Sequence, residues 1–195
     1  MSIAEQLNLV SVEQYLAAEQ TSPIKYEYLG GVVYAMSGGR NQHNLISGNV
    51  FGTLWSRLRG QACRPYNSDT KIRIRLPGHL RFYYPDASVV SQPNPAGYVY
   101  QDAPVLILEV LSRSTKRLDL GEKKEAYLSV PSLDLYLVAE QTLPAVIVFR
   151  RTENGFQREV WTGLDAIIPL PEWDTELPLA EVYDGVDFAG ETDND

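Results

Sequence analysis

The chain has 195 residues, of which 44% are hydrophobic and 22% charged, a balance typical of a globular domain rather than a disordered or fibrous protein. No apolar stretch approaches the roughly 20 residues that span a bilayer, and the N-terminus lacks the basic flank and apolar core of a signal peptide. We therefore expect a cytoplasmic protein with no membrane partner. Cys63 is the single cysteine, which excludes a disulfide framework and a cysteine metal cluster.

The net charge of −8 is unevenly distributed along the chain. Ten of the 25 acids lie in residues 165–195, where there is no Lys or Arg, so the rest of the chain has 15 acids against 17 bases. The overall charge therefore does not exclude a nucleic-acid substrate. We expect one domain over residues 1–185 and an acidic, disordered tail over residues 186–195.

Hydrophobic periodicity and turn residues predict the elements in chain order. We expect a short helix at 11–18, a hairpin at 26–36 that turns at Gly30-Gly31, an amphipathic helix at 43–59, strands at 70–76, 82–90 and 105–111, a helix at 119–128, and strands at 133–138 and 145–150. From the long helix onward the order is helix, three strands, helix, strand. This order predicts an α/β or α+β fold in which helices pack on a mixed central sheet.

Two acids interrupt strand candidates that are otherwise apolar. Asp86 follows Pro85 within residues 82–90, and Glu109 lies in the middle of residues 105–111. Burying a carboxylate costs several kcal/mol unless the group is paired or coordinates a metal, and packed strands rarely contain one. We therefore interpret Asp86 and Glu109 as two parts of one site.

A pair of carboxylates on adjacent strands suits a divalent cation. Mg²⁺ prefers one or two carboxylates together with waters and phosphate oxygens, and a bound cation can polarise a phosphate and generate hydroxide. Asp86 and Glu109 would supply the carboxylates, and the carbonyl oxygen of Val110 would be a third ligand. The residues alone therefore predict an acidic pair that binds a metal.

Several short segments, in a fixed order, carry a resemblance to a known family. They are Glu27-Tyr28-Leu29-Gly30-Gly31, His43, Tyr84-Pro85-Asp86, Glu109-Val110-Leu111-Ser112, and Asp119-Leu120-Gly121-Glu122-Lys123 with Tyr127. With them, residues 11–151 resemble the PD-(D/E)XK nuclease superfamily and, within it, the Uma family of restriction endonucleases, long carried as a domain of unknown function. The segments are weak singly and fairly specific together.

The resemblance implies a restriction-endonuclease-like fold and hydrolysis of DNA phosphodiester bonds. It implies Mg²⁺, or Mn²⁺ as a substitute, on Asp86 and Glu109. It adds Glu27 as an accessory acid beside the metal and His43 as a contact to phosphate. By analogy with nucleases of this fold, which commonly cut both strands as dimers, we also expect a homodimer.

The chain departs from the superfamily pattern at one position. The lysine of (D/E)XK should stand two residues after Glu109, where the sequence has Leu111. Related nucleases place polar side chains over the metal from the following helix, and Asp119, Lys123 and Tyr127 recur there at four-residue steps. We therefore expect Lys123 to position the attacking water or to stabilise the transition state, with Tyr127 and Asp119 in support.

Plainer interpretations stand beside these. Asp86 could be a turn residue, and Glu109 could be one half of a buried ion pair. Glu27 could be an exposed hairpin residue, and His43 could be a surface or capping residue. Lys123 could be a solvated lysine, and Asp119 could stabilise the N-terminus of its own helix. Two other functions also remain open. One is a binding or regulatory protein that keeps the nuclease fold without catalysis, and the other is a Mg²⁺-dependent hydrolase of a small phosphate ester.

Overall fold

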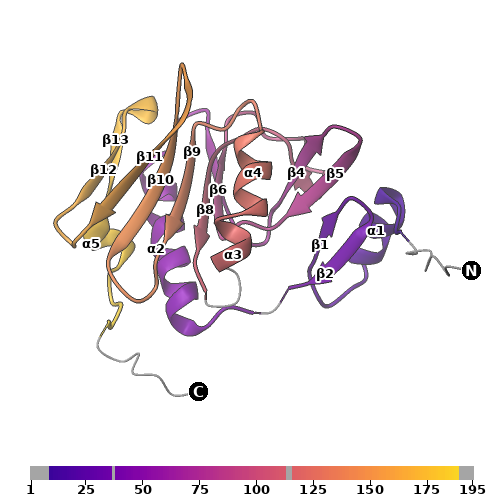
Figure 1. Cartoon of the computed structure of the whole chain (residues 1–195), viewed down its shortest axis with the longest axis horizontal. Coiled ribbons are helices and arrows are strands. Elements are labelled where there is room, and N and C mark those ends of the chain that lie inside the picture. The colour runs from indigo at the N-terminus through magenta and orange to yellow at the C-terminus, as the bar shows by residue number, and fades with distance from the viewer. Residues whose placement is uncertain (1–8, 37, 113–115, 189–195) are drawn as a thin grey trace, which may run out of the picture.

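Two larger sheets dominate the fold, which a computed structural model describes for residues 9–36, 38–112 and 116–188 (Figure 1). A five-stranded sheet has the order β2 (Val32–Ala35), β1 (Tyr26–Leu29), β5 (His79–Tyr83), β4 (Lys71–Leu76) and β7 (Tyr100–Gln101). A six-stranded sheet has the order β11 (Gly155–Thr162), β10 (Ala145–Thr152), β9 (Leu135–Ala139), β8 (Pro104–Val110), β6 (Ala87–Val90) and β3 (Arg64–Asn67). Strands β12 (Ile167–Leu170) and β13 (Thr175–Pro178) pair separately.

Helices cover both faces of the six-stranded sheet. They are α2 (Asn41–Arg57) on one face, and α4 (Glu122–Leu128) with α3 (Lys116–Asp119) beside it on the other. Helix α5 (Leu179–Val182) and a 3₁₀ turn, η1 (Pro171–Trp173), lie on the α2 side, while α1 (Val12–Glu19) packs on the five-stranded sheet. The sheet is mixed because β8 and β9 run parallel while the other neighbours in it are antiparallel. The predicted fold class, a mixed sheet flanked by helices, is confirmed.

The alternation of side chains along β8 separates two cores. Leu106 and Leu108 face α2, where Ile46, Val50 and Leu54 recur every four residues and are fully buried. Ile107 faces the other way and packs with Ala126 and Tyr127 of α4 and with Tyr136 of β9. Glu109 shares the parity of Ile107, so its carboxylate lies on the α4 side of the sheet.

The predicted hairpin forms as expected. Strands β1 and β2 are antiparallel and joined by Gly30 and Gly31, whose φ angles are +60° and +107°. Both values lie in the left-handed region, which glycine adopts without steric cost. The hairpin joins the rest of the molecule through β1, which pairs with β5.

The predicted strand at 82–90 is wrong as a single element. The chain leaves the five-stranded sheet at the end of β5, passes through Tyr84, Pro85 and Asp86, and enters the six-stranded sheet as β6. Pro85 has no N–H to donate to a ladder, so a strand is readily interrupted there. Asp86 consequently lies at the junction of the two sheets.

The predicted helix at 119–128 is also divided. It forms α3 and α4, and Asp119 therefore ends one helix while Lys123 and Tyr127 belong to the next. Gly121 lies between them with φ −115° and ψ −106°, and a Cβ atom at this position would lie 2.7 Å from the carbonyl oxygen of Arg117. The close approach of the backbone explains why a glycine stands at the break.

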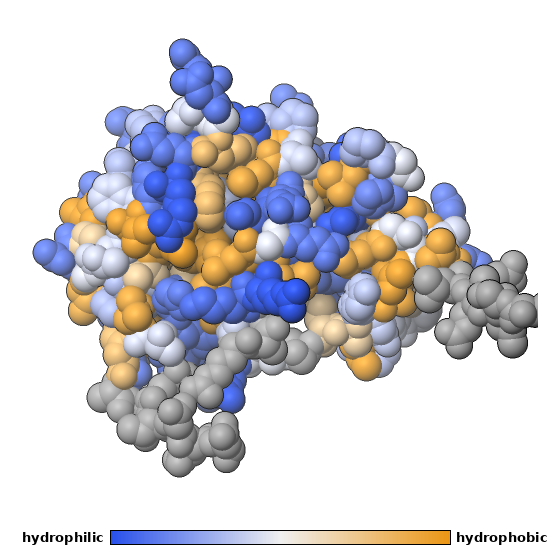
Figure 2. All heavy atoms as spheres, viewed as in Figure 1, coloured by the Kyte–Doolittle hydropathy of each residue, from blue (hydrophilic) through white to orange (hydrophobic). Residues whose placement is uncertain are grey.

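Much of the acidic C-terminal stretch belongs to the folded domain. Strand β13 and helix α5 pack on α2, and Val186 and Phe188 lie against the same core. Residues 189–195 of the expected tail lie outside the described residues, so the tail stays a prediction. Figure 2 shows hydrophilic and hydrophobic residues interspersed over the face viewed in Figure 1. Among the described residues, no helix is long and apolar enough to cross a membrane.

Candidate functional site

Asp86 and Glu109 face each other across two paired strands. The antiparallel ladder of β6 and β8 pairs Ala87 with Leu108, and continuing it by one residue sets Asp86 opposite Glu109. The backbone N–H of Val110 donates to Oδ2 of Asp86 over 2.7 Å. The Asp86 carboxylate therefore accepts a hydrogen bond that a backbone carbonyl would accept in a regular strand pair. The Asp86 side chain keeps 15% of its surface exposed, which gives solvent access to a pair that is otherwise buried.

Helix α2 holds Asp86 from the other side. Nε2 of His43 lies 3.2 Å from Oδ2 of Asp86, and the hydroxyl of Ser47 donates to the carbonyl oxygen of Asp86 over 3.0 Å. His43 and Ser47 are four residues apart and therefore lie on one helix face. Ser47 was not predicted, although its spacing from His43 was a usable signal.

The Asp86 contact controls the titration of His43. Burial alone would lower the pKa of His43, but the hydrogen bond and the negative charge of Asp86 outweigh burial and raise the pKa above its ordinary value of 6.5. Nδ1 of His43 is buried and has no hydrogen-bond partner in the described part of the chain. The imidazole is therefore held on Asp86 through Nε2, and Nδ1 faces the protein interior near Gly39.

Lys123 lies among the acids on the α4 side of the sheet. Its Nζ is 2.9 Å from Oε1 of Glu27 and 3.4 Å from Oε1 of Glu109, and the hydroxyl of Tyr127 donates to the same Glu109 oxygen over 3.2 Å. Lys123 is only 5% exposed, so the interpretation as a solvated lysine is wrong. Glu27 is 6% exposed, so the interpretation as an exposed hairpin residue is wrong as well.

Asp119 joins this cluster across the break between the two helices. It is 2% exposed, and its Oδ1 lies 3.8 Å from Nζ of Lys123. The expectation that Asp119, Lys123 and Tyr127 share one continuous helix face fails because of Gly121. The structure nevertheless brings the three side chains to one place.

Three carboxylates therefore surround one ammonium group in a buried space. Burial disfavours the ionised form of Glu109, and the charge of Lys123 favours that form. The negative charges of Asp86, Asp119 and Glu27 disfavour the ionised form as well, so that the pKa of Glu109 lies well above its ordinary value. Burial would lower the pKa of Lys123, but Glu109, Glu27 and Asp119 raise it. The lysine is thus held as a cation inside an excess of negative charge.

The donor set fits a cation held by two carboxylates and solvent. Among the described residues, no three His, Cys, Asp or Glu side chains converge as a complete cage of metal ligands. Mg²⁺ does not need such a cage, because it keeps several waters and substrate oxygens around one or two carboxylates. Asp86 and Glu109 meet this requirement, and the negative excess around Glu109 favours an added positive charge. The Val110 carbonyl stays a predicted ligand.

The position expected for the motif lysine is part of the core. Leu111 is 3% exposed and packs in the cluster that contains Ile107 and Tyr127. Its N–H donates to the carbonyl of Ala139. Lys123 reaches Glu109 from α4, so an ammonium group stands beside the acid although its position in the sequence differs.

Two tyrosines before Pro85 also belong to the site and were not predicted as site residues. The backbone N–H of Tyr84 donates to Oε1 of Glu27 over 3.3 Å, and Nζ of Lys123 lies 5.5 Å from the centre of the Tyr83 ring. Both residues stand directly before the Pro-Asp dipeptide. Their place beside that dipeptide was a signal for contact with the site.

These features define a class of fold, a restriction-endonuclease-like α+β domain with an acidic site at the junction of its sheets. The crystal structure of "a putative nuclease belonging to DUF820" from Anabaena variabilis has the same fold, with a TM-score of 0.68, 17% identity, and coverage of 92% of this chain and 98% of that chain. The chain belongs to the Uma2 family, described as "Putative restriction endonuclease", whose model matches residues 12–180.

Two relatives from Synechocystis support the same assignment. One is 33% identical over 147 residues, which is 75% of this chain and 76% of the relative. The other is 26% identical over 144 residues, which is 72% of this chain and 80% of the relative. Both are described as uncharacterized proteins, so they support the family and add no activity.

Proposed function

We propose that the chain is a metal-dependent endonuclease that hydrolyses DNA phosphodiester bonds. The observation that carries this proposal is the meeting of Asp86 and Glu109 at the sheet junction with the cationic Lys123 beside them. Membership in a family described as restriction endonucleases supports the substrate class. The proposal extends to Mg²⁺, or Mn²⁺ in its place, as the cofactor.

Each residue has a distinct task in this proposal. Asp86 and Glu109 would hold the cation, which when bound supplies Lewis-acid stabilisation of the phosphate and lowers the pKa of a water. Lys123 would place a fixed positive charge where negative charge develops in the transition state. Glu27 holds the ammonium group through its 2.9 Å contact and thereby positions Lys123.

Solvent-facing groups around the cluster suit a phosphate backbone. Arg40 is exposed at the N-cap of α2, three residues before His43, and Arg117 is exposed in α3, two residues before Asp119. Guanidinium groups pair well with phosphate oxygens. His43, which contacts Asp86 through Nε2, would position this carboxylate.

A plasmid assay tests the activity. We expect the purified chain to nick or cut supercoiled DNA with Mg²⁺ or Mn²⁺, and we expect Asp86→Asn and Glu109→Gln to abolish cleavage. Lys123→Met should reduce the rate by roughly 10²–10³-fold, the usual effect of removing a group that stabilises transition-state charge. Lys124→Met, one residue away on α4, is the matched control and should cut at the wild-type rate.

Other outcomes separate the competing functions. Cleavage that persists unchanged in Asp86→Asn and Glu109→Gln would show that the site assignment is wrong. DNA binding without cleavage under either metal would favour the catalytically inactive binding protein. Hydrolysis of small phosphate esters alone would favour the small-substrate hydrolase. The proposed homodimer is tested by light scattering of the purified chain, where a monomer mass would refute it.

A further inference from the structure

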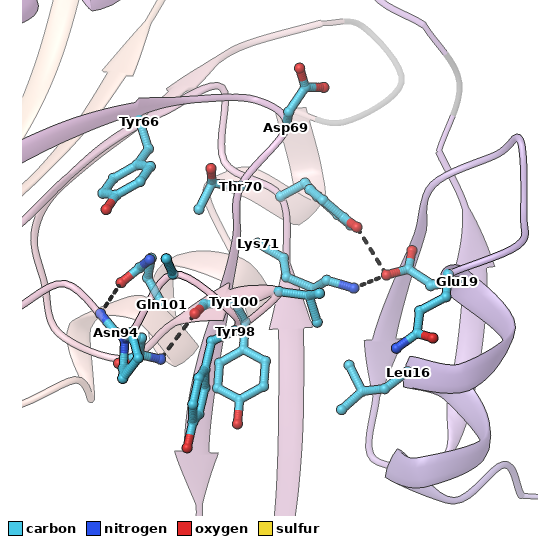
Figure 3. A pocket seen from close by; sticks show the side chains of 15 residues that line it. Leu16, Glu19, Tyr66, Asp69, Thr70, Lys71, Asn94, Tyr98, Tyr100 and Gln101 are labelled. Atoms are coloured by element: carbon cyan, nitrogen blue, oxygen red, sulfur yellow. Dashed lines mark hydrogen bonds and ion pairs between the residues drawn. The ribbon is translucent and has the colours of Figure 1, made fainter.

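A cavity lies between α1, β4 and the segment 94–101. Its volume is about 470 Å³, within the usual range for pockets that take small molecules. Figure 3 shows side chains from these three parts of the chain around it. The tyrosines at its wall are Tyr66, Tyr84, Tyr98 and Tyr100.

The charged residues of the wall are already paired. Lys71 forms an ion pair with Glu19, both nearly buried (Figure 3). The hydroxyl of Tyr84 donates to Glu19 over 2.9 Å. Asp69 pairs with Lys25. Because each of the charged residues that line the cavity has a partner of opposite charge, the cavity suits a neutral ligand better than a phosphate group.

Two amide side chains supply hydrogen-bonding groups in fixed orientations. The backbone N–H of Asn94 donates to Oε1 of Gln101 over 2.7 Å, and Nδ2 of Asn94 donates to the carbonyl of Tyr100 over 2.9 Å. These bonds commit the oxygen of Gln101 and the nitrogen of Asn94. Gln101, only 7% exposed, therefore retains its Nε2 donor, and Asn94 retains its Oδ1 acceptor, for a ligand in the cavity.

The rings at the mouth of the cavity suit a planar ligand. Tyr98 is 53% exposed, and its ring stands edge-on to that of Tyr100, with centroids 5.5 Å apart and an interplanar angle of 81°. Tyr100 is held in place because Arg73 donates to its hydroxyl over 2.9 Å. An exposed aromatic face beside a donor and an acceptor is the arrangement with which proteins stack and read a base.

Tyr84 connects the cavity to the acidic site. Its side chain lines the cavity, its backbone N–H donates to Glu27, and Asp86 follows two residues later. None of Asp86, Glu109 and Glu27 lines the cavity, so only an extended ligand could occupy both places. A nucleic acid offers this combination, because each phosphate carries a neighbouring base.

We propose that this cavity is a nucleobase subsite, which takes an unstacked base of the nucleic-acid substrate. The inference rests on the proposed nuclease function and adds a substrate class. The chain would prefer single-stranded or locally unpaired DNA, since a base within an intact duplex cannot enter a pocket. Tyr98 would stack on the base, and Gln101 and Asn94 would bind its polar edge.

Binding of two labelled oligonucleotides tests the subsite. One is a single-stranded DNA, and the other has the same backbone with its bases replaced by abasic sites. Fluorescence anisotropy is measured at one fixed salt concentration and without divalent metal, so that nothing is cleaved. We expect the wild-type chain to bind the intact strand roughly tenfold more tightly, a typical effect of stacking one base on an aromatic ring.

Variants assign this preference to the cavity. Tyr98→Ala should bind both strands with the weaker affinity, and Gln101→Leu should lose part of the preference. Trp55→Ala removes an aromatic ring of similar exposure, 49%, that does not line the cavity, and should keep the full preference. Equal affinity of the wild-type chain for the two strands, no binding of either, or a full preference in Tyr98→Ala would overturn the subsite.

The two proposals fail in different ways. A chain that prefers the intact strand through Tyr98 but never cleaves DNA keeps the base subsite and loses the nuclease chemistry. A chain that cleaves DNA but binds both strands equally keeps the nuclease chemistry and loses the base subsite.

Discussion

The ammonium group of Lys123 lies within 4 Å of three carboxylates, those of Glu27, Glu109 and Asp119. One positive charge does not balance three acids in a space shielded from water. Burial above all, and then the neighbouring acids, raise the pKa of Glu109, and Lys123 offsets only part of this. A divalent cation on Asp86 and Glu109 would supply the missing positive charge. At the residue scale, the same contacts that stabilise the cluster therefore favour metal binding.

Removing Lys123 should destabilise the fold as well as the activity. Lys123→Met leaves buried carboxylates without their cation, and breaking a buried ion pair from one side costs about 3–5 kcal/mol. Lys124→Met loses only a contact with the ring of Phe149, which is worth about 1 kcal/mol or less. Urea unfolding of the two variants measures the difference, and equal stabilities would contradict the burial argument for Lys123.

A partly exposed ion pair, Arg73 with Asp102, gives a pH dependence. Arg73 donates to both oxygens of Asp102, each over 2.7 Å. Burial would raise the pKa of Asp102, but hydrogen bonds from Arg73 and Asn94 and the charge of Arg73 lower it below its ordinary value of 3.8.

A carboxyl group whose pKa is lowered in the folded state stabilises the fold above its unfolded pKa and loses this contribution as the pH falls through the folded pKa. We therefore expect Asp102→Asn to be less stable than the wild-type chain at neutral pH, and the gap to close below about pH 3.8, the ordinary pKa of the group. Thermal unfolding measured across the acid range tests this. A gap that stays constant would refute the role of Asp102.

At the element scale, the break between α3 and α4 positions the site. Gly121 allows the backbone to pass close to the carbonyl of Arg117, so that Asp119 and Lys123 meet although they belong to different helices. The other break, at Pro85, delivers Asp86 to the sheet junction. Both interruptions occur where a residue with special backbone properties stands next to an acid of the site.

A pair of glycine substitutions tests the first break. In Gly121→Ala the new Cβ atom would lie 2.7 Å from a backbone oxygen, so the helix junction must shift, and we expect a loss of roughly 1–3 kcal/mol in the free energy of unfolding. Gly52→Ala, inside α2 with open space around it, should instead gain up to about 1 kcal/mol from better helix propensity. Chemical denaturation distinguishes the signs, and a neutral Gly121→Ala would contradict the strain argument.

The sequence predicted the elements whose patterns are local and strong. The amphipathic helix α2, the glycine hairpin and the apolar strands β8, β9 and β10 follow from periodicity and turn residues. Short strands such as β3 and β7 were missed because four or fewer residues give little pattern. The division of 82–90 and of 119–128 depended on tertiary pairing, which a linear pattern does not contain.

The candidate site was predictable in part for the same reason. Asp86 and Glu109 stand out because a carboxylate conflicts with its apolar neighbours in the sequence. The burial of Glu27 against Lys123 joins residues 96 positions apart, and no spacing rule indicates such a contact. Only the resemblance to a nuclease family marked these two residues before the structure placed them together.

At the scale of the whole molecule, the acids that make the net charge negative lie partly far from the candidate site. Two acids of the C-terminal stretch, Glu176 of β13 and Glu181 of α5, lie in the layer that packs on α2. Arg57 of α2 pairs with Glu181 in that layer, so part of this charge is neutralised within the fold. The cluster around Lys123 lies on the other face of the six-stranded sheet, where α4 packs.

Calorimetric titration with Mn²⁺ tests most directly whether Asp86 and Glu109 form a metal site. We expect the wild-type chain to bind the metal, and Asp86→Asn and Glu109→Gln to lose the binding heat. Glu153→Gln, which removes an exposed acid in the turn between β10 and β11, should titrate like the wild type. Absence of binding by the wild-type chain, or unchanged binding by both site variants, would contradict the assignment.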